Sequence, residues 1–280
     1  MSSAEEITRR SNSNLALAFF ALPEPRRKAM GVFYAFCRQV DDLADDAGIP
    51  LEQRRDALAR WRAALRQGIP GEPSFAGEVR ALIRAYGVNL QLLDDLLDGV
   101  ESDFLPVRFN TFAELNQYCY QVASAVGLVS IEIFGYRNPQ TRRYAYLLGQ
   151  ALQLTNIIRD VEVDLRHGDR IYLPLTELAQ HGYSEEKLRQ RVYDRAFVSV
   201  LQAQADRAHG FFREARRLLP REDVRAMVAA ELMRRIYQQL LRKIEADRFR
   251  MFYTRYRFTR AQKVWMVARA FASNRLGFKP

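Results

Sequence analysis

The chain has 280 residues, of which 48% are hydrophobic and 27% charged, a composition typical of a folded globular protein and not of a disordered one. Its only cysteines, Cys37 and Cys119, are too few for a disulfide framework or a structural zinc site, so we expect a reducing, cytoplasmic setting. A formal net charge of +10 favours contact with polyanions, whether phosphorylated substrates, an anionic membrane surface or nucleic acid.

Helices are predicted along most of the chain, because long segments rich in Ala, Leu, Arg, Glu and Gln are separated by short Pro- and Gly-containing breaks. Alternating strand patterns are nearly absent, so we predict one all-α domain covering residues 1–280. No apolar run reaches the roughly 18 residues of a spanning helix, and two glutamates precede the run at 15–22, which is atypical of a signal peptide. In chain order, the predicted helices span residues 26–46, 51–67, 75–86, 90–102, 112–134, 140–164, 185–219 and 221–252.

Two groups of residues with acidic side chains lie at helical spacing in distant parts of the chain. In VDDLADD, Asp41 and Asp45 are four residues apart and therefore share one helical face. The second group lies in QLTNIIRDVEVD. Its four members follow one another at intervals of three, four and four residues, so they also share one helical face. Like charges at this spacing destabilise a helix unless something offsets them. A hard divalent cation would do so, and we predict Mg²⁺, which shares its coordination sphere with substrate phosphates. The members of the second group are Gln153, Asn156, Asp160 and Asp164.

Arginines accompany both groups: Arg38 lies one turn before Asp41, and Arg159 directly precedes Asp160. Mg²⁺ together with arginines is suited to holding a diphosphate and stabilising it as a leaving group. A solvated surface is the simpler interpretation of any single acidic cluster. We adopt it for the third cluster, Asp94, Asp95 and Asp98 in QLLDDLLDGVESD. The sequence contains no HExxH, P-loop, GxGxxG or GxSxG motif, so nothing points to those other chemistries.

Three further segments are candidates for a site. YCYQVASAVG places Tyr118, Tyr120 and several small residues on one helix, which predicts either close helix packing or room for a ligand. RIYLP, at residues 170–174, adds an Arg and a Tyr shortly after the second acidic group. Basic and aromatic residues are interleaved over residues 248–263. This mixture suits an anionic membrane surface, a diphosphate, nucleic acid or simply a solvated face.

Taken together, four segments resemble the squalene/phytoene synthase family of trans-isoprenyl diphosphate synthases. They are FYAFCRQVDDLADD, LLDGVESDF, YCYQVASAVGLVSIEIFG and LTNIIRDVEVDLRHGDRIYLP. The resemblance extends over about residues 11–260. It implies an isoprenoid-synthase fold, which is a single-domain helical bundle with a central cavity. It also implies head-to-head condensation of two prenyl diphosphates, with Mg²⁺ held between two Asp-rich helices.

The resemblance further implies roles for individual residues. Tyr120 would lie near the reacting carbons. The Mg²⁺ ligands would be Asp41, Asp45, Asn156, Asp160 and Asp164. The substrate would be bound by Tyr34, Arg38, Gln153, Arg159, Ser13, Asn14 and Arg260. The chain departs from the family pattern at four positions: Glu162 replaces the Gly of RDVGED, Ser124 the Gly of VAG, Asn14 the Phe of a Ser-Phe pair, and Phe249 a C-terminal tyrosine.

We therefore expect a bacterial enzyme that condenses two farnesyl diphosphates to presqualene diphosphate without NADPH, since no C-terminal hydrophobic anchor and no dinucleotide motif are recognisable. The alternatives within the family are phytoene synthesis from geranylgeranyl diphosphate and dehydrosqualene or squalene synthesis. A class I terpene cyclase would also pair two acidic motifs, but it would use one prenyl diphosphate. A basic helical nucleic-acid-binding protein would explain the charge but not the paired acidic faces, so we expect no nucleic-acid partner. Peripheral contact with the inner face of the membrane is expected instead.

Overall fold

The computed structural model describes residue 19 and residues 22–46 and 48–259; Ser13, Asn14 and Arg260 lie outside these residues. Within them the chain is helical, as predicted, and the only β-type pairing is an isolated parallel bridge between Arg108 and Ile171. None of the helices in this part of the chain is long and apolar enough to cross a bilayer.

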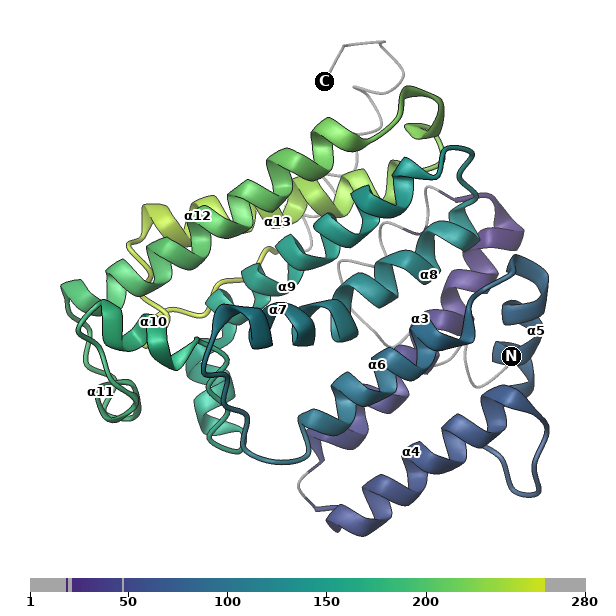
Figure 1. Cartoon of the computed structure of the whole chain (residues 1–280), viewed down its shortest axis with the longest axis horizontal. Helices are drawn as coiled ribbons and strands as arrows, with labels where there is room; N and C mark the ends of the chain where they lie inside the picture. Colours follow the sequence, from purple (N-terminus) through teal and green to yellow (C-terminus); the bar gives the residue numbers. More distant parts are fainter. Residues whose placement is uncertain (1–18, 20–21, 47, 260–280) are drawn as a thin grey trace.

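The first helices form one end of the molecule (Figure 1). They are α3 (Glu24–Asp45), α4 (Leu51–Arg66), α5 (Ala76–Tyr86) and α6 (Leu90–Ser102), close to the predicted bounds. Trp61 of α4 joins them, because its ring contacts Phe36 of α3 at a centroid distance of 4.9 Å and Phe75 at 5.5 Å. Burial of Phe36 and Val40 fixes the rotation of α3, which leaves the Asp41 side of the helix exposed.

The predicted helix over 112–134 is interrupted. It consists of α7 (Phe112–Cys119), a π-helical turn at Tyr120–Ser124 and α8 (Ala125–Phe134). The next helix, α9 (Gln140–Arg166), approaches this turn closely, because a Cβ atom at Gly149 would lie 2.5 Å from the Ser124 Cα. Of the two interpretations of the small residues in this segment, the structure therefore supports close helix packing.

The C-terminal half differs from the prediction at its breaks. The segment 185–219 forms two helices, α11 (Glu185–Arg189) and α12 (Arg195–Leu218), because the Asp194 side chain caps α12 by accepting a hydrogen bond from the Phe197 N–H at 2.8 Å. The last predicted helix is shorter: α13 covers Val228–Ala246 and follows a 3₁₀ turn at Arg221–Asp223. Positive φ angles at Arg248 and Phe249 follow its end. The short α10 (Leu175–Gln180) was not predicted.

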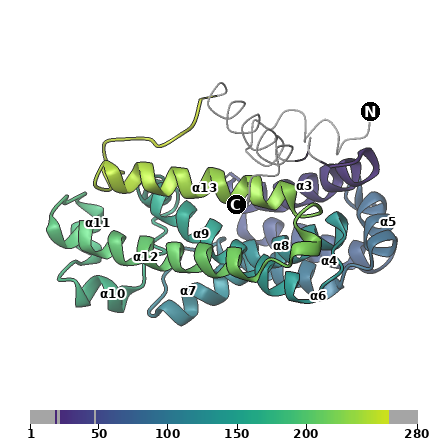
Figure 2. The same cartoon turned by 90° about the horizontal axis from the view of Figure 1, so that it is seen from above.

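These elements surround α9. Figure 1 shows α9 between the α12–α13 pair and the α7–α8 segment, and α12 is its most extensive packing partner. Seen from above, α3 and α13 lie along one face and α6 and α7 along the opposite face, with α8 and α9 between them (Figure 2). The two predicted acidic groups therefore belong to helices of one bundle, α3 along one face and α9 inside.

Candidate active site

The first acidic group lies at the C-terminal end of α3. Arg38 pairs with Asp41 at 3.2 Å and with Asp42 at 2.5 Å on the same helix. The surrounding protein limits hydration of the Asp41 carboxylate and Asp45 adds a like charge, so the pKa of Asp41 rises to about 6. Because 55% of the Asp41 side chain is exposed, solvent screens part of this effect.

The second acidic group lies in the C-terminal half of α9, and its side chains are half-buried. Asp160 accepts a hydrogen bond from Nε of Arg159 at 2.8 Å, so it has its own cation. Burial raises the pKa of Asp164 to about 8, and the charge of Asp160 one turn earlier adds to the rise. A cation beside Asp164 would therefore stabilise the ionised form of its carboxyl group.

A third carboxylate, Asp103, lies between the two groups. It accepts hydrogen bonds from the Tyr118 hydroxyl at 2.8 Å and from the Tyr172 hydroxyl at 2.8 Å. Its charge raises the pKa of both Asp41 on α3 and Asp164 on α9. Because such effects act over short distances inside a protein, residues of both acidic groups lie within reach of the Asp103 charge.

Arg170 connects the parts of this site. Its guanidinium donates to an Asp45 carboxylate oxygen at 3.0 Å, to the Ala44 carbonyl at 2.7 Å and to the Asp103 carbonyl at 3.1 Å. The Arg170 side chain is only 12% exposed. It thereby fixes the C-terminal end of α3 against the loop that follows α6. Asp103, Tyr118, Arg170 and Tyr172 were not assigned roles from the sequence, although all four lie in the segments that carry the resemblance.

The residues present fit a magnesium ion shared with a substrate. The Asn156 Oδ1 atom is buried without a hydrogen-bond donor, while its Nδ2 atom donates to Gln153 at 3.3 Å. An unpartnered amide oxygen beside aspartates is a suitable ligand for a hard cation. No three His, Cys, Asp or Glu side chains of the described residues converge on one ion.

Tyr120 follows α7 and contacts α6. Its hydroxyl donates to Asp95 of α6 at 2.7 Å, and its ring lies 6.2 Å from that of Tyr146. Tyr146 precedes Asp160 by 14 residues, or about 20 Å along α9. The role of Tyr120 near the reacting carbons stays a prediction. Limited hydration and the hydrogen bond to Asp95 raise the pKa of Tyr120 to about 12.

The other members of the third acidic cluster serve helix packing. Asp94 pairs with Arg66 of α4 at 2.8 Å, and Asp98 pairs with Arg62 of α4 at 2.6 Å. These contacts join α4 to α6 and support the structural interpretation of Asp94 and Asp98.

Comparison with known proteins identifies the family. A family model described as squalene/phytoene synthase matches residues 8–262. The chain belongs to the squalene/phytoene synthase family. A 15-cis-phytoene synthase of Synechococcus elongatus is 36% identical over 264 residues, covering 88% of this chain and 84% of that protein. A presqualene diphosphate synthase of Rhodopseudomonas palustris is 36% identical over 241 residues, covering 85% of each.

Solved structures agree with this membership of the squalene/phytoene synthase family. A dehydrosqualene synthase in complex with ligand superposes with a TM-score of 0.83 at 25% identity, over 98% of this chain and 95% of that chain. A squalene synthase from Alicyclobacillus acidocaldarius superposes with a TM-score of 0.75 at 26% identity, over 88% of this chain and 93% of that chain. The isoprenoid-synthase fold that the resemblance implied is confirmed.

Three departures from the squalene/phytoene synthase pattern have structural explanations. The Glu162 carboxylate accepts two hydrogen bonds from Nε of Arg191 at 3.0 Å, which joins α9 to the loop after α11. The buried Ser124 hydroxyl donates to the Tyr146 carbonyl at 2.8 Å and so spans the close contact between helices. Phe249 is fully buried, with a positive φ. Tyr34, a predicted substrate contact, is half-buried beside Phe19, with ring centroids 6.2 Å apart.

Proposed function

We propose that the protein joins two farnesyl diphosphates head to head to give presqualene diphosphate. Its family condenses prenyl diphosphates in this manner, and the finer assignment concerns the substrate and the product. The observation that carries the proposal is that Arg170 contacts both acidic groups, since its guanidinium donates to Asp45 at 3.0 Å and its N–H donates to the Asp164 carbonyl at 3.1 Å, which creates one place where a diphosphate could be ionised. Phosphorylated substrates also suit the net charge of +10.

In this proposal, Mg²⁺ would be held by oxygen atoms of the two acidic groups and would neutralise the diphosphate as it leaves, producing an allylic cation. The ligands would be Asp41, Asp45, Asn156, Asp160 and Asp164. Arg38 and Arg159 already lie beside these carboxylates, and their guanidinium groups can turn to the departing diphosphate oxygens. Gln153 holds the Asn156 amide, which leaves the Asn156 carbonyl oxygen directed away from it.

The next steps need an environment that excludes water. The double bond of the second prenyl chain attacks the cation, and loss of a proton closes the cyclopropane ring. The aromatic side chains next to the acidic groups suit this task, because the rings of Tyr118 and Tyr172 stack with centroids 5.2 Å apart, and both residues are buried. Asp103 fixes both hydroxyl groups, so neither ring is free to turn away.

The chain length of the substrate is the point at which relatives differ. The phytoene synthase and the presqualene diphosphate synthase are both 36% identical to this chain, whereas the two solved structures are named for dehydrosqualene and squalene. These C30 products favour farnesyl diphosphate. The alternative is phytoene synthesis from geranylgeranyl diphosphate. Incubation with each labelled diphosphate, with and without NADPH, followed by mass spectrometry, tests the assignment.

We expect a cyclopropylcarbinyl diphosphate from farnesyl diphosphate alone, with no effect of NADPH. Phytoene from geranylgeranyl diphosphate, with farnesyl diphosphate inert, would establish the alternative. Squalene formed only with NADPH would refute the proposed end point. Cyclisation of one prenyl diphosphate would instead indicate a terpene cyclase.

The metal-binding role predicts a clear difference between acidic residues. Asp41→Asn and Asp160→Asn should abolish turnover and leave the far-UV circular dichroism unchanged, because these carboxylates lie on helix faces that do not form the core. Asp94→Asn is the matched control, since Asp94 belongs to the same residue type but pairs with Arg66. Wild-type rates in both site variants would refute the assigned ligands.

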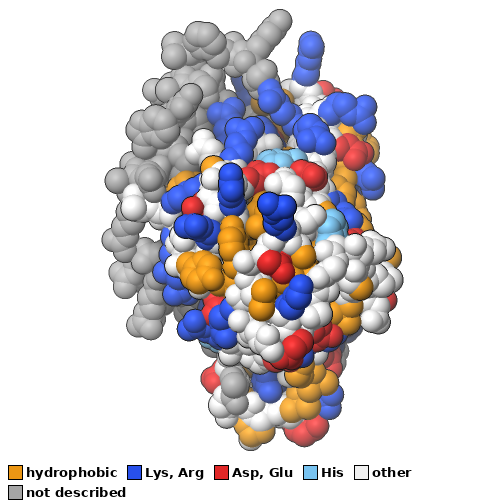
Figure 3. Space-filling view, turned by 90° about the vertical axis from the view of Figure 1, so that its left-hand side faces the viewer, with side chains coloured by type: hydrophobic (Ala, Val, Ile, Leu, Met, Phe, Trp, Pro, Cys, Tyr) orange, Lys and Arg blue, Asp and Glu red, His pale blue; other side chains and the backbone are white. Residues whose placement is uncertain are grey.

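We also propose that the protein contacts anionic membranes through the segment that follows α13. Tyr253 is 70% exposed there, and Arg248, Arg250, Arg255 and Arg257 are exposed around it. Figure 3 shows Lys and Arg side chains spread over this end of the molecule. Co-sedimentation with phosphatidylglycerol vesicles should fall as salt rises, because ions screen the attraction. Tyr253→Ser should weaken binding, and absence of binding at low salt would refute the contact.

A further inference from the structure

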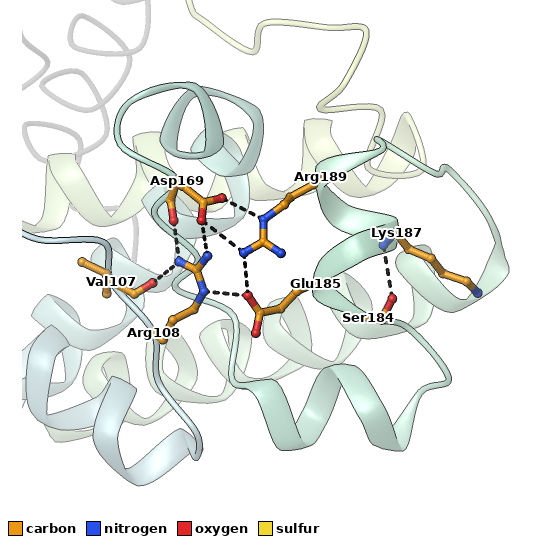
Figure 4. A network of polar contacts seen from close by, with 7 residues as sticks. All are labelled: Val107, Arg108, Asp169, Ser184, Glu185, Lys187 and Arg189. Carbon is orange, nitrogen blue, oxygen red and sulfur yellow. Dashed lines mark hydrogen bonds and ion pairs between the residues drawn. The ribbon is translucent and has the colours of Figure 1, made fainter.

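Four charged residues, one of which directly precedes Arg170 in the chain, contact one another (Figure 4). Nε of Arg108 donates to Glu185 at 2.7 Å, and the same guanidinium also contacts the Asp169 carboxylate and its carbonyl oxygen. Arg189 donates to both carboxylate oxygens of Asp169 at 3.1 Å and to Glu185 at 3.0 Å. We call Arg108, Asp169, Glu185 and Arg189 the charged quartet.

The charged quartet links three segments of the chain. Arg108 lies in the loop between α6 and α7, Asp169 in the turn after α9, and Glu185 and Arg189 at the two ends of α11. Its two positive and two negative charges balance. Hydrogen bonds from Arg189 and Arg108 lower the pKa of Asp169, although limited hydration opposes them, so this carboxylate is ionised at neutral pH.

The backbone next to the charged quartet carries site residues. Asp169 directly precedes Arg170 and has a φ of 54°, a conformation that needs support in any residue other than glycine. The Arg170 N–H donates to the Asp164 carbonyl at 3.1 Å, and the Ile171 N–H donates to the Val107 carbonyl at 3.1 Å. Neighbouring side chains of this segment have different partners. Asp169 contacts the other members of the charged quartet, whereas Arg170 contacts Asp45 and Tyr172 contacts Asp103.

We infer that Arg108 and Asp169 are positioning residues that hold Arg170 and Tyr172 against Asp45 and Asp103. A change in the Asp169–Arg170 peptide would displace the Arg170 guanidinium from three oxygens at once. The spacing between the end of α3 and Asp103 would then be free to vary, and with it the spacing between the two acidic groups. The inference rests on the proposed function, because it explains how the proposed Mg²⁺–diphosphate site keeps its shape.

The test is calorimetric binding of inorganic pyrophosphate in the presence of Mg²⁺ to the full-length protein. Asp169→Asn removes the charge but keeps a residue that tolerates a positive φ. We expect it to weaken pyrophosphate binding about tenfold or more, the range typical of residues that orient ligands indirectly. The matched control is Glu72→Gln, because Glu72 accepts two hydrogen bonds from Arg80, at 2.6 and 2.9 Å, far from the acidic groups. It should bind like the wild type.

A double-mutant cycle distinguishes positioning from general stabilisation. If Asp169 acts through Arg170, Asp169→Asn should add little to the loss caused by Arg170→Lys, whereas Glu72→Gln should be additive with it. Arg189→Lys, which leaves the Arg108 contacts in place, is a milder second variant and should show a smaller loss in the same direction. Unchanged pyrophosphate binding in Asp169→Asn, or additive losses with Arg170→Lys, would overturn the inference. Failure of the wild type to bind would instead overturn the proposed function, and the inference with it.

Discussion

Replacing Asp164 by Asn should stabilise the metal-free protein while removing its activity. In the folded protein the pKa of Asp164 lies at about 8 instead of the ordinary 3.8, because burial and Asp160 disfavour the ionised form. A carboxyl group whose pKa is raised on folding favours the folded state below pH 3.8. That advantage is lost progressively as the pH rises to about 8.

The size of the effect follows from the same shift. Between pH 3.8 and pH 7 the Asp164 carboxyl group ionises freely in the unfolded chain but not in the folded protein. This difference lowers the free energy of unfolding by up to about 4 kcal/mol. Relaxation of the acidic groups reduces this value, so we expect Asp164→Asn to gain about 1–3 kcal/mol at pH 7. The gain should nearly vanish at about pH 3 and below, where both states are protonated.

Urea unfolding of both proteins in EDTA at several pH values measures this difference. The midpoint of Asp164→Asn should exceed that of the wild type by an amount that grows with pH up to about 8. Mg²⁺ with pyrophosphate should stabilise the wild type alone, since a ligand that binds only the folded state raises its stability. A variant that is less stable than the wild type, or a difference independent of pH, would refute the reasoning.

Two further predictions follow from the positions of single side chains. Tyr118→Phe should lower kcat about tenfold, because it removes a hydrogen bond to the Asp103 carboxylate. An unchanged kcat in steady-state assays would contradict this role of Tyr118. Glu162→Gly restores the usual family residue, yet it should lower the free energy of unfolding by about 1–3 kcal/mol, because it frees Arg191 and places glycine inside α9. An unchanged midpoint of urea unfolding would show that the contact between Glu162 and Arg191 contributes nothing to stability.

The sequence predicted those features that repeat along a helix. The bounds of α3, α4 and α6 and the shared faces of the acidic groups depend on periodic apolar residues, which are visible without a structure. Asp103 could not be found in this way, and Arg170 was found only as part of a candidate segment, because each lies in a loop and acts on residues distant in the chain. Arg170 reaches Asp45 across 125 positions. The break before α12 was missed because Asp194 ends a pattern that otherwise continues as a helix.

The π-helical turn at Tyr120–Ser124 makes the length of this segment as important as its composition. A π-helical turn contains one residue more than an α-helical turn, so deletion of a single residue here would allow α7 and α8 to join as one regular helix. All side chains of α7 would then rotate by about 100° relative to α8. Tyr118 would leave Asp103, although every hydrophobic residue of the segment would remain. A change in the length of Tyr120–Ser124 would therefore disturb the site as much as a substitution in the acidic groups.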